Sequence, residues 1–246
     1  VIAVAGPLIG RMPGGCGELV DGREIRWKKN HGREWRADME RRIIFATGNE
    51  NKMEEIRMIL EDLPMPVHSM KEAGVEADIV EDGMTFEENA EIKARAVSRL
   101  LPNDIVLADD SGLEIDYLDK APGIYSARFA GEDTSYDIKN RILLDKLEGV
   151  PEEERTARFV CAVAAVFPDG EVKTVRGTIE GRVAHEIIGE NGFGYDPIFY
   201  YPETDCTTAE MSPEQKNELS HRGNALRAMR KILERYVEEA ERAEEG

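Results

Sequence analysis

The chain contains little cysteine or histidine. Its 246 residues include three cysteines, Cys16, Cys161 and Cys206, and four histidines. An odd number of widely separated cysteines does not form a disulfide framework, and their spacing is not that of a zinc site. We therefore expect a protein of the reducing cytoplasm, because disulfides persist mainly in oxidising compartments.

Long apolar runs and an excess of positive charge are also absent. No stretch reaches the roughly 18 to 20 apolar residues of a membrane helix, so we expect no membrane span. The 50 aspartates and glutamates outnumber the 32 lysines and arginines, which gives a formal net charge of −18. Proteins that bind nucleic acid present a basic face to the phosphates, so we expect no nucleic-acid partner.

The first 41 residues differ from the rest of the chain. They combine an apolar start, a glycine-rich stretch and a charged segment with both tryptophans, Trp27 and Trp35. Three interpretations remain open: an extra hairpin or arm, a disordered tail, or residues added before a natural start at Met39. We expect a peripheral extension over 1–41 without a catalytic role, one domain over 42–240 and a frayed tail over 241–246.

An acidic pair marks the middle of the domain. The β-branched run Ile105–Ala108 predicts a buried strand that stops at a turn, Asp109-Asp110-Ser111-Gly112, before a second strand over 113–117. Adjacent carboxylates at the end of a buried strand need a cation, backbone N–H groups or a shared proton. Mg²⁺ suits such a pair. The alternative is an acidic turn in water.

A strand, a polar turn and a helix open the domain. Residues 43–46 predict the strand, 47–52 the turn and 53–63 an amphipathic helix. Unpaired N–H groups and the helix dipole make such a turn an anion site. Lys52 lies where the dipole disfavours a cation, which suggests that it binds a ligand. The alternative is an exposed lysine tolerated at small cost.

Further helices carry charged residues of interest. Thr85 and Glu88 predict a capping box for a helix over 86–100, with Glu81 in the loop before it and Lys93 inside it. A helix over 134–147 is expected to turn Ile138, Ile142, Leu143 and Leu147 inward. Ser212 predicts the start of a short helix. Ser220 predicts a second N-cap, for a helix over 221–239 that carries His221 and Arg222 in its first turn.

Strands are expected over 157–167 and 171–179, joined by the turn Pro168-Asp169-Gly170, and a further strand over 181–188. The glycine-rich aromatic turn 192–197 follows. Its rings either pack in the core or stack on a flat ligand, with Asp196 reading the edge of that ligand.

These residues form two chemical sets. The carboxylates Glu81, Asp109 and Asp110 could hold Mg²⁺. Five cations could neutralise phosphates: Lys52, Lys93, Arg128, Lys216 and Arg222. The set fits a polyphosphate ligand with Mg²⁺. No GxxxxGK[ST] loop and no Ser-His-Asp or Cys-His arrangement is evident, which argues against a P-loop NTPase.

Six motifs occur in an order that resembles one known family. They are Thr47-Gly-Asn-x-x-Lys52, Thr85-Phe-x-Glu-Asn-Ala-x-x-Lys93, Ala108-Asp-Asp-Ser-Gly112, Ala121-Pro-Gly-Ile-Tyr-Ser-Ala-Arg128, Phe193-Gly-Tyr-Asp-Pro197 and Ser220-His-Arg-Gly223. Over residues 42–236 the chain resembles the inosine/xanthosine triphosphate pyrophosphatases. Residues 1–41 lie outside the resemblance.

The resemblance implies an α/β fold with a mixed twisted sheet, flanking helices and two lobes around a cleft, usually as a homodimer. It implies Mg²⁺-dependent hydrolysis of ITP, dITP and XTP to the monophosphate and pyrophosphate. Asp110 would be the catalytic base, and Glu81 and Asp110 would hold the metal, with Asp109 assisting. Substrate contacts would come from Thr47, Gly48, Asn49, Glu50, Asn51, Lys52, Lys93, Ser111, Arg128, Phe193, Gly194, Tyr195, Asp196, Lys216, His221 and Arg222.

Two other functions remain open. One is a related pyrophosphatase that prefers other modified nucleotides, against which the Phe193–Asp196 and Ser220–Arg222 motifs speak. The other is a non-catalytic nucleotide sensor, although a pure binder needs no carboxylate cluster.

Overall fold

The computed structural model describes residues 17–20, 23–30, 33–38 and 42–245, and its contacts divide the chain into two compact units, Val1–Arg41 and Arg42–Gly246. In the first unit, β1 (Gly17–Val20), β2 (Arg23–Asn30) and β3 (Arg33–Asp38) form an antiparallel sheet in the order β1-β2-β3. The choice among the three interpretations of this segment stays a prediction, and so does the peripheral, non-catalytic role of the segment.

The second unit is built on a mixed seven-stranded sheet in the order β10-β9-β8-β7-β6-β4-β5. Its strands are β4 (Ile43–Phe45), β5 (Val67–Ser69), β6 (Ile105–Ile115), β7 (Thr156–Val166), β8 (Val172–Val183), β9 (Phe199–Tyr201) and β10 (Cys206–Thr207). β4 pairs in parallel with β5 and β6, whereas the other pairs are antiparallel. The predicted α/β class with a mixed sheet is confirmed.

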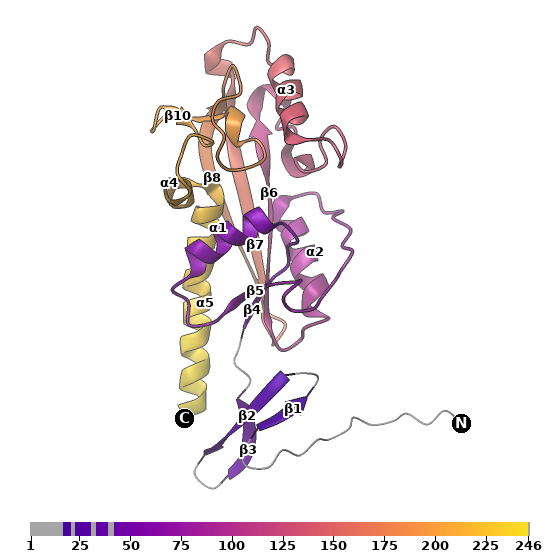
Figure 1. Cartoon of the computed structure of the whole chain (residues 1–246), viewed down its shortest axis with the longest axis vertical. Helices are drawn as coiled ribbons and strands as arrows, with labels where there is room; N and C mark the ends of the chain where they lie inside the picture. Colours follow the sequence, from indigo (N-terminus) through magenta and orange to yellow (C-terminus); the bar gives the residue numbers. More distant parts are fainter. Residues whose placement is uncertain (1–16, 21–22, 31–32, 39–41, 246) are drawn as a thin grey trace, which may run out of the picture. The chain divides into compact units, whose positions relative to one another are not determined.

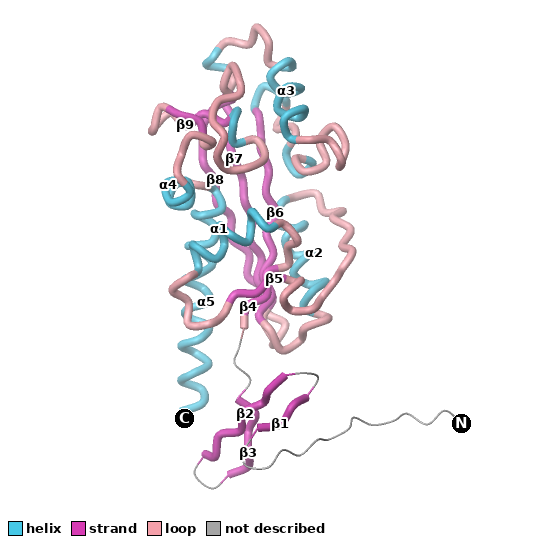
Figure 2. Tube along the Cα trace, in the orientation of Figure 1, coloured by secondary structure: helices cyan, strands magenta, loops and turns pink. Residues whose placement is uncertain are grey.

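Helices cover both faces of this sheet (Figures 1 and 2). They are α1 (Glu50–Leu60), α2 (Phe86–Ser98), α3 (Tyr136–Lys146), α4 (Pro213–Leu219) and α5 (His221–Glu245). Short 3₁₀ turns are η1 (Asp116–Leu118), η2 (Gly123–Tyr125), η3 (Glu152–Glu154) and η4 (Asp196–Ile198). No described helix is long and apolar enough to cross a membrane.

Side-chain alternation along β6 separates two layers of the core. Ile105 and Leu107 pack with α1 and α5, whereas Val106 and Ala108 pack with α2. Because successive side chains in a strand point to opposite faces, Asp109 continues the first series and Asp110 the second. β6 therefore presents one carboxylate to each layer.

The acidic pair does not form a turn, so the predicted break at Asp109–Gly112 is wrong. β6 runs without interruption from Ile105 to Ile115, and Asp109 and Asp110 pair in register with Val163 and Ala162 of β7. Gly112 allows a close approach here, since a Cβ on it would lie 2.4 Å from the Gly123 carbonyl oxygen. Side-chain cations contact and compensate both aspartates.

Several element boundaries also differ from the prediction. α1 begins three residues earlier than expected, with Asn49 as its N-cap, and α5 extends to Glu245. The strand expected over 181–188 is instead the end of β8, which stops at Val183. Ile138 of α3 is 50% exposed, so its predicted inward position is wrong, whereas Leu143 and Leu147 are buried.

The helix caps were predicted more accurately. Ser212 and Gln215 form a complete capping box, and Ser220 accepts a hydrogen bond from the Gly223 N–H (3.0 Å). At α2, Thr85 caps the helix as expected, but the Glu88 carboxylate accepts from the Met84 N–H instead of closing the box. A single N-cap of this kind contributes about 1 kcal/mol.

Candidate active site

The first part of the site is the turn between β4 and α1. Asn49 accepts a hydrogen bond from the Lys52 N–H (3.2 Å), and the Thr47 hydroxyl accepts one from the Asn49 N–H (3.2 Å). Residues 48–51 are exposed, so this helix N-terminus can receive an anion. The Lys52 ammonium pairs with Asp109 (3.0 Å), which compensates its unfavourable position at the positive end of the helix dipole.

Asp109 is held between two cations on the α1–α5 side of β6. Lys52 and Arg222 (3.3 Å) both contact its carboxylate, and Arg222 also donates to the Ser111 hydroxyl (3.1 Å). Burial alone would raise the pKa of Asp109, but Lys52, Arg222 and Lys93 hold it well below its usual range. Asp109 is therefore ionised at neutral pH.

Asp110 points to the opposite face, toward α2. Lys93 donates to Asp110 (3.2 Å) and to Glu81 (2.9 Å), and Asn89 donates to Asp110 (3.2 Å). Arg128 donates to the Glu81 carbonyl oxygen (3.2 Å), which ties a second loop to this cluster. Burial raises the pKa of Asp110; Lys93 opposes the rise and Glu81 adds to it. A carboxylate with a raised pKa is suited to accept a proton.

Glu81 and Asp110 could together hold a divalent cation. Both carboxylates contact the one ammonium of Lys93, so both have oxygens within reach of a single positive charge. Mg²⁺ commonly takes one or two carboxylates and completes its shell with water and phosphate oxygens, which fits this pair. Asp109 points to the other face of β6. Across the described part of the chain, no three His, Cys, Asp or Glu side chains converge as a metal site.

An aromatic cavity of about 50 Å³ lies on the Asp109 side of β6. It is lined by Ser111, Gly112, Ser126, Tyr136, Phe159, Phe193, Gly194, Tyr195, Asp196, Lys216, His221 and Arg222. Lys216 and Arg222 both lie over the Phe193 ring, 4.7 and 5.5 Å from its centroid. The cavity therefore combines flat rings with two cations, a combination that can bind a polar aromatic ligand.

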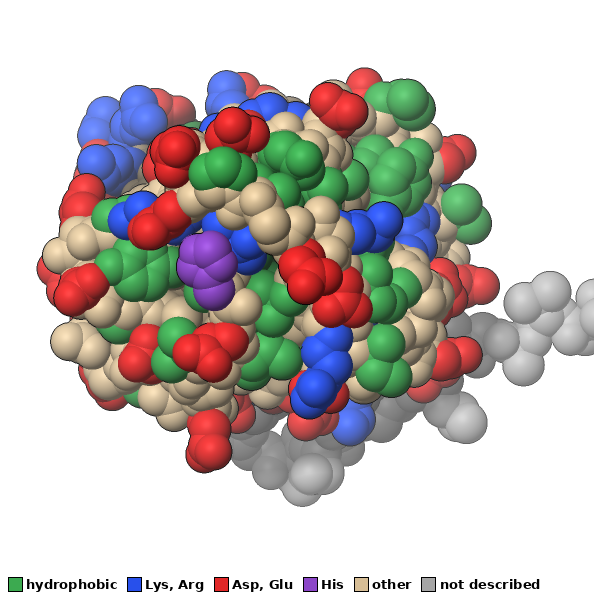
Figure 3. Space-filling view, turned by 90° about the horizontal axis from the view of Figure 1, so that it is seen from above, with side chains coloured by type: hydrophobic (Ala, Val, Ile, Leu, Met, Phe, Trp, Pro, Cys, Tyr) green, Lys and Arg blue, Asp and Glu red, His purple; other side chains and the backbone are tan. Residues whose placement is uncertain are grey.

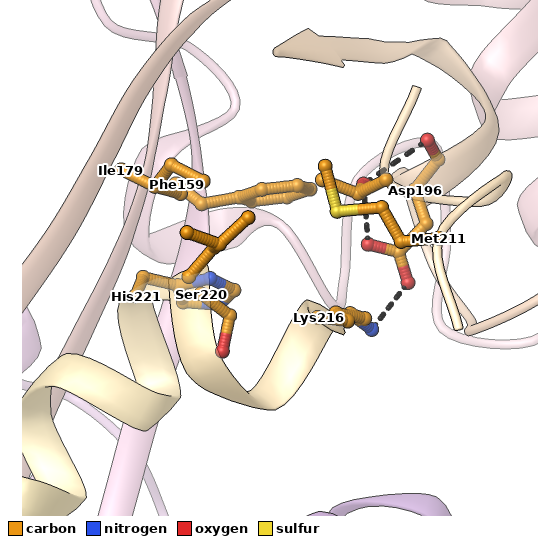
Figure 4. Close-up of a pocket in the computed structure, with 9 residues that line it drawn as sticks. Phe159, Ile179, Asp196, Met211, Lys216, Ser220 and His221 are labelled. Atoms are coloured by element: carbon orange, nitrogen blue, oxygen red, sulfur yellow. Dashed lines mark hydrogen bonds and ion pairs between the residues drawn. The ribbon is translucent and has the colours of Figure 1, made fainter. Parts of the chain in front are cut away.

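The carboxylate of Asp196 holds the turn that forms this cavity. It accepts hydrogen bonds from the Phe193 N–H (2.8 Å), Lys216 (2.7 Å) and Thr208 (2.9 Å). Figure 4 is a close-up of a second pocket, which is lined by Ile179 and Met211 and shares Lys216, Asp196 and His221 with the aromatic cavity; it shows the ion pair between Lys216 and Asp196. The Asp196 carboxylate therefore accepts hydrogen bonds from three protein groups, which fix its position at the edge of the cavity.

His221 forms another wall of the cavity. Its ring stacks on Phe159, with centroids 4.8 Å apart and an interplanar angle of 20°. Burial, followed by repulsion from Arg222 and Lys216, lowers the pKa of His221 well below its usual value, so the imidazole is neutral. Its buried Nδ1 has no hydrogen-bond partner among the described residues. An unsatisfied buried nitrogen is costly, and a ligand could satisfy it.

The predicted site residues thus fall into two groups, one on each side of β6. Residues 47–52, Asp109, Ser111, Lys216 and Arg222 share one side with the cavity, whereas Glu81, Lys93, Asp110 and Arg128 lie toward α2. On the face that Figure 3 displays, acidic side chains are spread widely, with lysines and arginines among them. The clustered cations of the site contrast with that acidic surface.

Glu55 of α1 was missed by the sequence reasoning. Its carboxylate pairs with Lys216 (2.9 Å) and with Arg222. The available signal was its spacing: it lies three residues after Lys52, on the same face of the helix. Tyr136 and Phe159 were also missed, because only the folded chain brings α3 and β7 to the cavity.

Comparison with known proteins identifies the family of the chain. The model of the Ham1 family matches residues 43–232. A dITP/XTP pyrophosphatase of Caldanaerobacter subterraneus is 47% identical over 198 residues, which are 80% of this chain and 98% of that protein. One of Bacillus subtilis is 48% identical over 191 residues, 78% of this chain and 96% of that protein.

A solved structure supports the same assignment. The Ham1 protein of Staphylococcus aureus aligns with a TM-score of 0.71 and 44% identity, over 79% of this chain and 98% of that one. The predicted family resemblance is confirmed: the chain belongs to the Ham1 family.

Proposed function

We propose that the chain hydrolyses deaminated purine nucleoside triphosphates, namely ITP, dITP and XTP, to the monophosphate and pyrophosphate. The chain is an enzyme of the nucleoside triphosphate pyrophosphatase class. One observation carries the more specific proposal. The ion pairs of Lys52 with Asp109 and of Asp109 with Arg222 join the α1 anion site to the aromatic cavity. A triphosphate and a base could therefore bind in one continuous site.

In this proposal the N-terminus of α1 and Lys52 bind the phosphates, with further contacts from Lys93, Ser111 and Arg128. Lys216, which lies over the Phe193 ring, contacts the base instead of the phosphates. Asp110 accepts the proton of the water that attacks the α-phosphorus, a role that suits its raised pKa. Glu81 and Asp110 would hold Mg²⁺, which when bound supplies positive charge beside the phosphate oxygens. Positioning and charge neutralisation are the main requirements of phosphoryl chemistry, so no covalent intermediate is needed.

Recognition of the base is assigned to the aromatic cavity. The base would stack on its rings, while polar groups around His221 and Arg222 contact its edge. A site built to hydrogen-bond a 6-oxo group leaves buried donors unpaired when a 6-amino group is present, which penalises ATP. The neutral His221, with its unpartnered Nδ1, supports this assignment.

The proposal also includes the cytoplasm as location and a homodimer as assembly, which rest on the sparse cysteines and on the family resemblance. A non-catalytic nucleotide sensor is the second candidate function, and a pyrophosphatase for other modified nucleotides is the third. No specific contact in the site favours either over the first.

Product analysis tests the proposal. The protein is incubated with ITP, XTP, ATP and GTP, each with and without Mg²⁺, and the products are separated by ion-exchange chromatography. Monophosphate and pyrophosphate from ITP and XTP, with ATP and GTP largely spared, would support the proposal. Diphosphate and orthophosphate would contradict the mechanism, and binding without turnover would favour the sensor.

A further inference from the structure

Glu55 lies between two cations of the aromatic cavity without lining the cavity itself. Lys216 and Arg222 line the cavity, whereas Glu55 contacts both of them from α1. The side chains of Lys216 and Arg222 are only 8% and 2% exposed, and that of Glu55 is 15% exposed. Two buried like charges repel each other, so a carboxylate between them lowers the cost of holding them together.

The same contacts form a row of alternating charge. In order, its members are Asp196, Lys216, Glu55, Arg222, Asp109 and Lys52, each paired with the next. The row begins at the aromatic turn and ends at the N-terminus of α1. Glu55 has a cation on each side of it in the row. Lys52 lies three residues before Glu55 on the same helix, α1. The row therefore connects the cavity to the anion site through α1.

We propose that Glu55 is a positioning residue for base recognition, which holds Lys216 and Arg222 side by side over the Phe193 ring. The inference rests on the proposed function, because it assigns the base to this cavity. Both cations lie over the same ring, at 4.7 and 5.5 Å, and reach it from α4 and α5 on either side of Ser220. Without Glu55, no carboxylate would contact both cations, so nothing between them would offset their mutual repulsion.

Removal of Glu55 should leave the protein folded. Lys216 keeps Asp196 and Arg222 keeps Asp109, so each cation still has one buried carboxylate partner. Burial alone would raise the pKa of Glu55, but Arg222 and Lys216 lower it, so the wild-type residue is ionised. The Glu55→Gln change thus removes one charge with little change of shape.

The test compares Glu55→Gln and Glu55→Asp with Glu54→Gln, the matched control. Glu54 lies next to Glu55 on α1 and is exposed, so its replacement removes the same charge away from the cations. Isothermal titration calorimetry measures binding of IMP, which carries the base, and of inorganic tripolyphosphate, which lacks it. Steady-state kinetics give the ratio of kcat/KM for ITP to that for ATP, and thermal melting checks the fold.

Glu55→Gln should bind IMP about tenfold more weakly, the effect of one charge-assisted contact, and should lower the ITP-to-ATP ratio. It should bind tripolyphosphate at least as tightly as the wild type. Glu55→Asp should lie closer to the wild type than Glu55→Gln does, and Glu54→Gln should match the wild type.

Unchanged IMP binding in Glu55→Gln would overturn the inference, and so would equal losses of IMP and tripolyphosphate binding. An equal loss of IMP binding in Glu54→Gln would also overturn it, because the loss would then follow from the change in net charge and not from the contacts of Glu55. Failure of the wild type to hydrolyse ITP would instead refute the proposed function, while the binding comparison would still test Glu55.

Discussion

The ammonium of Lys93 offers a direct test of the electrostatics around Asp110. Lys93→Met keeps most of the side-chain volume but leaves the carboxylates of Asp110 and Glu81 without their shared cation. Breaking a buried ion pair by removing one partner costs about 3–5 kcal/mol. The Glu81 side chain is 33% exposed and so partly screened by water, which leads us to expect a loss of about 2–3 kcal/mol at pH 8.

The loss should depend on pH in a defined direction. In the wild type, burial disfavours the charged form of Lys93, but Asp110, Asp109 and Glu81 raise its pKa. That contribution is complete below the pKa of an unfolded lysine and is constant between pH 5 and 8. In the variant, the folded pKa of Asp110 rises further, because burial and Glu81 are then opposed by Lys52 without Lys93. Stability of the variant therefore falls as pH rises through that pKa, and the penalty is larger at pH 8 than at pH 5.

Urea unfolding followed by circular dichroism measures the penalty at the two pH values, with EDTA present so that no divalent ion replaces the ammonium. Equal penalties at pH 5 and pH 8 would refute the reasoning. A penalty below about 0.5 kcal/mol, the level of an ordinary surface substitution, would also refute it. Lys71→Met, at an exposed position, provides the control.

Three further outcomes are expected. Asp110→Asn should lower kcat for ITP about 10²- to 10⁴-fold, while the circular dichroism spectrum stays that of the wild type. Near-normal turnover in this variant would show that Asp110 is not the catalytic base. Gly177→Ala should lower stability by about 1–3 kcal/mol, since its Cβ would lie 2.2 Å from the His221 carbonyl oxygen; an unchanged melting temperature would contradict this contact. EDTA should abolish turnover and added Mg²⁺ should restore it, and the Glu81→Gln variant should need a higher Mg²⁺ concentration than the wild type. Turnover that is unaffected by EDTA would show that the reaction needs no divalent cation.

Local signals were sufficient to predict the elements that flank the site. The strand and the helix around Lys52 and the N-caps at Ser212 and Ser220 all follow from short-range chemistry and occur in the structure, although the helix begins at Glu50, three residues earlier than predicted. The turn Pro168-Asp169-Gly170 does join two antiparallel strands, as its composition indicates. These features depend on residues a few positions apart, which a sequence displays directly.

The continuous strand β6 could not be predicted in this way. The cations that stabilise Asp109 within the strand lie 57 and 113 residues away, so a local pattern shows only a costly acidic pair and indicates a turn. The assignment of Asp109 and Asp110 to opposite faces follows from strand alternation only once the strand is known. Glu55 was overlooked for a related reason, since its partners lie 161 and 167 residues away.

Hydrolysis of ITP in ¹⁸O-labelled water tests the central claim most directly, because it reports which phosphorus atom the water attacks. Attack at the α-phosphorus, with Asp110 as the proton acceptor, places the label in IMP and leaves the pyrophosphate unlabelled. Mass spectrometry of the two products distinguishes these outcomes. Label in the pyrophosphate or in orthophosphate would contradict the account, because the water would then have attacked the β- or γ-phosphorus.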